Sequence, residues 1–513
     1  MTRGVKRKRI EQKDTGVTPG SRNRHKTEIF SVKIKEDIIV KKKLFCCVIA
    51  LMLLVAGCAE LPTASYADGS PESGEAGTSS AAATEAPESS EEEPVEQKEF
   101  DPNALRICFV VGDELAENDR DITALETLLA SGILTAGGPE NIEFDSIPYE
   151  GSAREIAMDR IRTEIMAGGG PDVFIVTTQG SNSLFPIPEK AMQEGVFLPL
   201  DTYIQDMAQS EWDKLTPAVL EAGRTDEGQV LVPMMYTLPI TIYKKEDVPE
   251  APPAGTTWQE MLSDETNILR NAAVMTNDVS GGLLPDTGGS MLSVLGRFTD
   301  YETNELLFSE EDLLQCAKAM LTLKDEIDRD DTLPVYAQGM LCGNGRLTFD
   351  EQSSEKYPIC KNDAMTMIPL YSKDGDVTAT VQAYTGINRN TKHAEEAFFV
   401  VDYLMRVDVQ QNFKLFYMLG QNYGLPIHED VLSPEFPQQK NGFFFTDENF
   451  ETFSGVRDQI TNVYFDNALV RSLSGLYSTL YYDYTYEGKE LPEQALKDAV
   501  HETYGALKQM LSE

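Results

Sequence analysis

Short runs of consecutive apolar residues stand out in the carboxy-terminal four fifths of the chain, separated by polar and Gly-rich segments. The run 105–111 ends at Gly112-Asp113, and the run 172–177 follows a glycine cluster. Apolar runs of this length predict strands buried on both faces, as in a parallel sheet covered by helices. A further strand is expected around 141–147. These runs predict a sheet with a buried core.

A helix is predicted between the second and third of these strands. Ser152 and Glu155 have the spacing of a capping box, and residues 168–171, Gly-Gly-Gly-Pro, end the helix. The apolar positions in between repeat every four residues, at Ala157, Ile161 and Ile165. A strand–helix–strand order of this kind predicts an α/β fold.

Three later segments also have clear patterns. Residues 377–387 have strand composition, and a helix capped by Asn390 or Thr391 is expected after them. Pro492 suits the first turn of a terminal helix, and Trp258 begins a short helix in which we expect it to pack. The predicted apolar faces of the two longer helices are Ala394, Ala397, Phe398, Val401, Leu404 and Met405, and then Ala495, Ala499 and Leu511.

The segment 41–58 combines three lysines, a short apolar run, small residues and a cysteine. It resembles a bacterial lipoprotein signal peptide with residues 55–58 as the lipobox, which implies cleavage before Cys58 and a diacylglycerol on its thiol. The run is shorter than the ~20 residues that a spanning helix needs, although an uncleaved anchor helix is the alternative. Either way, the body of the protein is expected outside the cytoplasm.

Residues 1–39 are polar and basic, unlike the start of a signal peptide. They indicate either a true start nearer Val32 or Val40 or a genuine cytoplasmic extension. Residues 58–100 are rich in Ser, Ala, Gly, Glu, Pro and Thr, which predicts a disordered acidic tether. We therefore divide this part into an extension with signal peptide, 1–57, and a tether, 58–100.

The charge excludes one class of partner. The chain has 84 Asp+Glu against 44 Lys+Arg, a net charge of −40. Without residues 1–57, which hold 14 Lys+Arg and 5 Asp+Glu, the remainder holds 30 and 79 and has a net charge of −49. Such a chain repels phosphate backbones and anionic lipid, so no nucleic acid is expected and membrane attachment must come from the lipid.

Motifs for catalysis and for cofactors receive no support from the sequence. The seven cysteines contain no CxxC pair, and with four histidines no metal site and no cofactor are predicted. The glycines at 168–170 end a helix instead of opening one, which argues against a phosphate loop, and the acidic run 328–331 lacks the spacing of a calcium loop. No hydrolase motif is present. A secreted hydrolase would need a carboxylate pair that the sequence does not single out.

Several segments, in order, resemble the extracellular solute-binding proteins of bacterial ABC importers, in particular the carbohydrate-binding family 1 that includes maltose-binding protein. The resemblance extends over most of 104–427 and the tail from about 478, and residues 428–477 do not align. Its segments are 160–175, 195–204, 228–245, 384–397 and 487–499.

The resemblance implies a periplasmic-binding-protein-like fold of two α/β lobes, a hinge and a ligand cleft between them. The chain would cross between lobes near 236–243, return near 377–383 and cross again near Leu425. Lobe 1 would then be 101–237 plus 380–427, and lobe 2 would be 238–379 plus 428–513.

The resemblance also places candidate ligand contacts. Ligands of open α/β sheets bind beyond the carboxyl ends of strands. Asp113 and Gln179 match by position polar contacts of the family, and Tyr236 is either a ligand contact or a packed hinge residue. The full set of expected contacts is Asp113, Glu114, Thr178, Gln179, Tyr236, Thr237, Phe349 and Tyr384.

The implied function is capture of a small solute, with an oligosaccharide favoured, and its delivery to the permease subunits of an ABC transporter. The protein would be a monomer and not an enzyme, anchored through Cys58 to the outer face of the cell membrane in the Gram-positive manner. The alternative is a sensor or adhesion lipoprotein that uses the same fold without transport.

Overall fold

The computed structural model describes residues 99–111, 119–148, 151–177, 183–246, 252–263, 292–328, 337–341, 365–411, 425–433, 447–480, 484 and 490–512. All of these lie in one of two compact units of the chain, Glu93–Glu513. The predicted signal peptide, Cys58 and nearly all of the predicted tether lie outside the described residues. Within the described ranges, no helix has the length and apolar character needed to cross a membrane.

Thirteen strands are described, and nine of them form one sheet. They are β1 Leu105–Val110, β2 Ile142–Phe144, β3 Val173–Thr177, β4 Arg224–Thr225, β5 Gly228–Gln229, β6 Leu231–Lys244, β7 Thr299–Asp300, β8 Glu305–Leu306, β9 Ala337–Leu341, β10 Met365–Pro369, β11 Val377–Ile387, β12 Leu425–Pro426 and β13 Ile460–Phe465.

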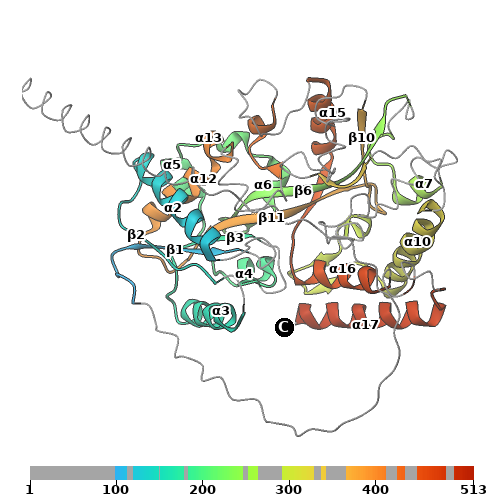
Figure 1. The fold of residues 1–513 in the computed structure, drawn as a ribbon, viewed down its shortest axis with the longest axis horizontal. Helices are drawn as coiled ribbons and strands as arrows, with labels where there is room; N and C mark the ends of the chain where they lie inside the picture. Colours follow the sequence, from blue (N-terminus) through green and yellow to red (C-terminus); the bar gives the residue numbers. More distant parts are fainter. Residues whose placement is uncertain are drawn as a thin grey trace, which may run out of the picture. The chain divides into compact units, whose positions relative to one another are not determined.

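Helices surround the sheet, interspersed with two short 3₁₀ segments. The described helical elements are α2 Asp119–Thr135, α3 Gly151–Met166, α4 Pro188–Gln193, α5 Asp201–Met207, η1 Trp212–Lys214, α6 Pro217–Glu221, α7 Trp258–Leu262, α10 Glu310–Asp328, α12 Ala394–Met405, α13 Val407–Gln410, η3 Glu429–Leu432, α15 Asp447–Arg457, α16 Ala468–Leu480 and α17 Glu493–Ser512. Figure 1 shows α16 and α17 side by side, in agreement with their many mutual contacts.

The main strand order of this sheet is β10-β6-β11-β3-β1-β2 (Figure 1). Its two long strands, β6 and β11, are neighbours in this order. The first part of β6 pairs with the last part of β11, while from Leu238 onward β6 pairs with β9 and β10. In the same way, β11 pairs with β13 up to Val381 and with β3 from Ala383. Both strands therefore exchange partners near their midpoints and connect a first half of the sheet, containing β1 to β3, with a second half, containing β9, β10 and β13.

The apolar runs 105–111 and 172–177 are confirmed as strands β1 and β3, and the strand expected around 141–147 is the short β2. The segment 377–387, predicted from its strand composition, is β11 with the predicted bounds. β1, β3 and β11 are almost completely buried, as expected for strands covered on both faces. The helix expected after the second strand is α3, and Gly168 and Gly170 follow it with φ of 80° and 98°, a conformation that favours glycine. The mixed α/β class of the sequence analysis is therefore the class of the structure.

Three sequence predictions about helices are wrong, two about their caps and one about a buried face. α3 begins at Gly151, so Ser152 lies inside the first turn and is not its cap. α12 begins after His393, and no side chain caps it. The predicted cap Thr391 instead donates from its hydroxyl to Asp172, at 2.5 Å, and accepts the His393 amide at 3.0 Å. In α17 the buried stripe lies one position later than predicted, at Leu496 and Val500, and Leu511 is buried as expected.

Trp258 behaves as the sequence predicted. It begins α7, is buried, and lies within the capping box formed by Thr257 and Glu260. Its role in the described structure is packing.

Candidate functional site

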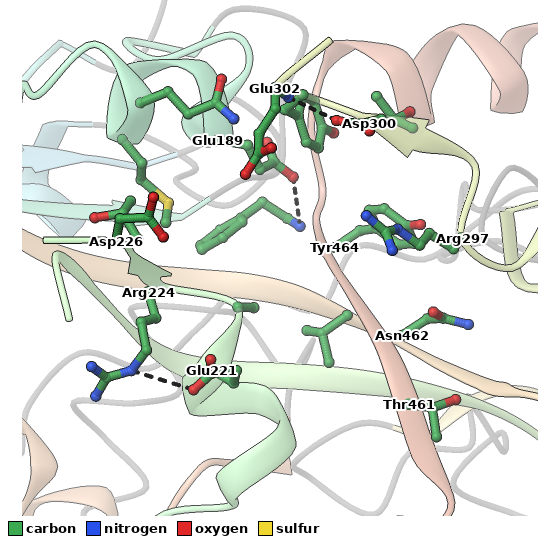
Figure 2. A pocket seen from close by; sticks show the side chains of 18 of the residues that line it. Glu189, Glu221, Arg224, Asp226, Arg297, Asp300, Glu302, Thr461, Asn462 and Tyr464 are labelled. Atoms are coloured by element: carbon green, nitrogen blue, oxygen red, sulfur yellow. Dashed lines mark hydrogen bonds and ion pairs between the residues drawn. The ribbon is translucent and has the colours of Figure 1, made fainter. Parts of the chain in front are cut away.

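A cavity of about 1110 Å³ lies between elements of the two halves of the sheet. From the first half, α4, the end of α6 and the turn of the β4–β5 hairpin line it. From the second half, the β7 segment and β13 line it (Figure 2). Volumes of this size accommodate small-molecule ligands. The lining residues are Glu189, Met192, Gln193, Glu221, Ala222, Arg224, Thr225, Asp226, Glu227, Arg297, Thr299, Asp300, Tyr301, Glu302, Thr461, Asn462, Val463, Tyr464 and Phe465.

Acidic groups dominate the charge of this cavity. Six carboxylates and two guanidinium groups line it, and part of this charge is paired within the protein. Arg224 forms ion pairs with Glu221 at 3.3 Å and with Asp201 at 3.2 Å. The excess of carboxylates repels anionic solutes and offers acceptors for hydroxyl or ammonium groups.

Glu189 of α4 connects the two halves at one wall of the cavity. Its carboxylate oxygens accept hydrogen bonds from the side-chain amide of Asn467, at 3.2 and 3.1 Å, and from the Phe465 amide at 3.4 Å. The Asn467 amide also donates to the Tyr301 hydroxyl at 3.0 Å. Burial raises the pKa of Glu189 to about 7, although these hydrogen bonds oppose the shift.

Asn467 is itself held in place by the start of α16. Its side-chain oxygen accepts the amides of Leu469 and Val470, at 3.0 and 3.2 Å, as a helix cap does. Asn467 therefore links Glu189 to the amino terminus of α16.

Aromatic rings and one amide complete the lining. Tyr464 is buried, its hydroxyl accepts the Phe298 amide at 2.8 Å, and its ring lies 4.8 Å from the Phe298 ring. The side-chain nitrogen of Asn462 is buried at the cavity wall and has no hydrogen-bond partner among the described residues. A buried donor without a partner costs free energy, so a ligand that accepts its hydrogen bond gains affinity there.

Of the contacts expected from the sequence, Tyr236 and Thr237 are described and buried where β6 exchanges partners. Tyr236 is fully buried and pairs with Leu425 of β12, and burial raises its pKa to about 12. The Thr237 hydroxyl accepts a hydrogen bond from the Gln382 side chain at 3.4 Å. Neither residue lines the cavity. The structure favours the packing alternative for Tyr236.

Tyr384 lies directly behind the cavity wall. Its ring is fully buried and packs edge-on against Phe465, with ring centroids 5.1 Å apart, and Phe465 lines the cavity. Burial and the nearby Glu189 carboxylate raise the pKa of Tyr384 well above its usual range. Tyr384 therefore supports the wall without contacting the cavity.

The other expected residues, Asp113, Glu114, Thr178, Gln179 and Phe349, lie outside the described residues, as does Cys58. The sequence analysis missed the residues that do line the described cavity. Asn462 and Tyr464, and Asn467 which donates to Glu189, come from the segment 428–477, which did not align, and Glu189 belongs to a helix of six residues. A local signal was present only in the dense polar and aromatic sequence 461–467.

The sequence of residues 137–298 matches the family model described as "Bacterial extracellular solute-binding protein". No curated protein matches the chain.

Solved structures with similar folds include a family 1 extracellular solute-binding protein from Alicyclobacillus acidocaldarius, with 15% identity and a TM-score of 0.47, covering 79% of this chain and 98% of that one. The sugar-binding protein MalE from Xanthomonas citri has 14% identity and a TM-score of 0.48, covering 80% and 97%. The GacH receptor of Streptomyces glaucescens, solved unliganded and with acarbose, has 13% identity and a TM-score of 0.45, covering 79% and 99%.

Proposed function

We propose that this chain, whose residues 137–298 match the family model of bacterial extracellular solute-binding proteins, captures an uncharged carbohydrate outside the cytoplasm and delivers it to an ABC transporter. The observation that carries the proposal is the cavity of about 1110 Å³, which receives carboxylates, an unpaired amide donor and aromatic rings from both halves of the sheet.

The lining favours a polyhydroxylated solute without negative charge. Carboxylates accept hydrogen bonds from hydroxyl groups, and the Asn462 amide donates to a hydroxyl or ring oxygen. The rings of Tyr301 and Tyr464 provide apolar faces against which C–H groups of a sugar pack. An anionic sugar would face the excess of carboxylates.

Closure around the solute would use the two long strands. β6 and β11 connect the halves where they exchange partners, so rotation near Tyr236 and Gln382 changes the width of the cavity with little change within either half. We keep 101–237 plus 380–427 and 238–379 plus 428–513 as the proposed lobes.

The residues expected at the strand ends remain proposed contacts. Thr178 and Gln179 directly follow β3 and precede α4, whose Glu189 lines the cavity. Asp113 and Glu114 follow β1 after the two residues Val111 and Gly112. Phe349 completes the proposed set of solute contacts. Thr237 is buried and does not line the cavity, so we propose that it supports the cleft without contacting the solute.

The family is one of binding proteins, and binding without turnover is the proposed chemistry of this chain. We further propose attachment to the outer face of the membrane through a lipid on Cys58, a monomeric state and a permease as the protein partner. Replacing Cys58 by Ser should abolish incorporation of labelled fatty acid into the protein, because the thiol that accepts the lipid is removed. Equal labelling of the Ser variant and the parent would contradict the lipid anchor.

A ligand panel tests the proposal on the full chain. Neutral oligosaccharides, sugar acids, peptides and polyamines are compared by thermal shift and then by calorimetry. A solute at a hundredfold excess over its dissociation constant stabilises the folded state by ~2.7 kcal/mol. We expect a neutral oligosaccharide to be the strongest ligand. Preference for a peptide, or release of sugar from a glycoside by the pure protein, would refute the proposal.

Replacing Asn462 by Ala separates binding in this cavity from binding elsewhere. Loss of a hydrogen bond to the solute should weaken binding roughly tenfold, because such a bond contributes ~1–1.5 kcal/mol. The matched control is Gln494→Ala, which removes an exposed amide of α17 that does not line the cavity. Equal affinities of the two variants would move the solute site away from the cavity.

A further inference from the structure

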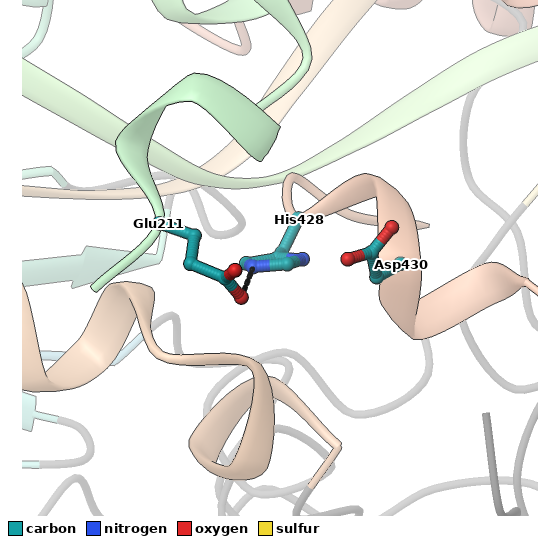
Figure 3. Close-up of side chains that lie close together, drawn as sticks. All are labelled: Glu211, His428 and Asp430. Atoms are coloured by element: carbon teal, nitrogen blue, oxygen red, sulfur yellow. Dashed lines mark ion pairs between the residues drawn. The ribbon is translucent and has the colours of Figure 1, made fainter. Parts of the chain in front are cut away.

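Three potential metal ligands converge outside the cavity, from parts of the chain more than 200 residues apart. One ligand atom each of Glu211, His428 and Asp430 lie within 4.8 Å of one another. Figure 3 shows the His428 ring between the two carboxylates, and one of its nitrogens, Nε2, lies 4.0 Å from the Glu211 carboxylate.

The state of His428 points to a ligand that the protein itself does not supply. Its side chain is 0% exposed, yet neither ring nitrogen has a hydrogen-bond partner in the described ranges. Buried polar atoms almost always have a partner, because leaving one without costs ~1–3 kcal/mol.

The backbone holds both sides of this cluster in position. Ser210 and Trp212, the neighbours of Glu211, donate to the buried carboxylate of Asp402, with the indole nitrogen at 2.7 Å. On the other side, the His428 amide donates to the Gln410 side chain at 2.9 Å. Glu211 and His428 therefore stand on backbone that is held in position, and the Glu211 side chain, which is 61% exposed, has room to rotate toward the ring.

We propose that Glu211, His428 and Asp430 bind one divalent transition-metal cation, with Zn²⁺ as the representative ion. One imidazole nitrogen and two carboxylate oxygens suit such an ion, and tetrahedral coordination places its ligand atoms ~3.3 Å apart at ~2.0–2.1 Å from the metal. The 4.0 Å separation of Glu211 and His428 closes to this value by a rotation of the exposed Glu211 side chain. Water takes the remaining position on the exposed side.

The nearby charges favour a cation. Besides the two ligand carboxylates, Asp213 and Lys214 are the nearby charged groups. The group as a whole is negative, so a dication relieves the repulsion between its carboxylates.

The site would fasten the chain where it returns to β6. Ile427 donates to the Met234 carbonyl at 3.1 Å and accepts from the Thr216 hydroxyl at 2.9 Å, and β12 pairs with Tyr236. A cation at His428 ties this return segment to residues 211–216 next to the point at which β6 exchanges partners. The proposal does not depend on the identity of the solute, so it stands if the carbohydrate assignment fails.

Calorimetric titration with Zn²⁺ tests the site on the metal-free full chain, purified without a polyhistidine tag. Glu211→Gln and His428→Gln should each weaken the tightest Zn²⁺ site roughly tenfold or more, since each removes one of three ligands. His501→Gln is the matched control, because His501 also forms a pair with a glutamate, at 3.0 Å, but is exposed. It should bind Zn²⁺ as the parent does.

Two further measurements can refute the proposed Zn²⁺ site. Glu211 is exposed, so its variant should fold even if the His428 variant does not, and parent-like Zn²⁺ affinity in Glu211→Gln would overturn the site. Co²⁺ should give visible absorption bands of an ion bound by nitrogen and oxygen, and these bands should be lost in Asp430→Asn. Binding of Ca²⁺ as tightly as Zn²⁺ would overturn the transition-metal assignment, because Ca²⁺ prefers oxygen ligands alone.

Discussion

Glu189 makes the stability of the protein dependent on pH. Its pKa of about 7 in the folded state lies above its ordinary value of 4.5, so between these values the folded state binds more protons than the unfolded state. The free energy of unfolding therefore loses this contribution as pH rises toward and through 7. Burial favours the protonated form of Glu189, against the hydrogen bond from Asn467.

Replacing Glu189 by Gln should remove this dependence. The variant stays neutral, so it should melt close to the parent at pH 5 and above it at pH 8, as measured by thermal unfolding in matched buffers. Glu302→Gln, which removes an exposed carboxylate of the same cavity, serves as the control. A parent and a Glu189→Gln variant with the same pH profile would show that Glu189 is ionised in the folded protein throughout this range.

Substitutions of Tyr236 distinguish a packing role of its side chain from a contact with the solute. Because its ring is fully buried, Tyr236→Ala should lower the free energy of unfolding by ~3–5 kcal/mol, measured by urea denaturation. Tyr236→Phe keeps the ring and should cost much less. If Tyr236→Ala instead retains stability and weakens solute binding tenfold or more, the side chain contacts the solute.

Replacing either of two glycines by Ala should change the stability of the protein, in opposite directions. A methyl group at Gly223, just before β4, would overlap the backbone carbonyl oxygen of Leu231, so Gly223→Ala forces a backbone shift and should cost ~1–3 kcal/mol. Gly475 lies inside α16 with no atom close to the added methyl group. Gly475→Ala should therefore stabilise the protein by ~0.5–1 kcal/mol through helix propensity. Urea denaturation of both variants measures the difference, and a destabilised Gly475→Ala would contradict the described course of α16.

The elements that could be predicted from the sequence are those whose signal is local. The apolar runs that form β1 and β3 are continuous in sequence because both faces of each strand are buried. The start of α12 could not be predicted, since Thr391 is drawn away from capping by Asp172, 219 residues earlier in the chain. Partners at such separations leave no pattern in a local window.

The cavity and the cluster of Glu211, His428 and Asp430 could not be predicted from the sequence for the same reason. Glu189 and Asn467 are 278 residues apart, and each alone is an ordinary polar residue. Likewise, His428 attracts attention only once its burial and its position between Glu211 and Asp430 are known. Chemistry assembled by folding from isolated residues has no spacing that a motif can express.

The large negative charge acts on the molecule as a whole. At a net charge of −40, self-repulsion disfavours the compact state, and added salt screens it as the Debye length falls from ~30 Å at 0.01 M to ~8 Å at 0.15 M. We expect the urea midpoint to rise between these NaCl concentrations and to change less with an equal osmolarity of sucrose. A midpoint that falls with salt would show that attractive ion pairs outweigh the net charge.

The position of β11 also determines when the sheet can form during synthesis. β11 lies between β3 and β6, but its residues 377–387 are made more than a hundred residues after β6. Until then, β3 and β6 lack their shared neighbour, and contacts so distant in sequence form slowly because a long loop must close first. A ribosome that has completed β6 therefore carries a chain that is still unable to build its central sheet. An exported protein gains from this delay, since the chain stays threadable through a translocation channel until most of it has been made.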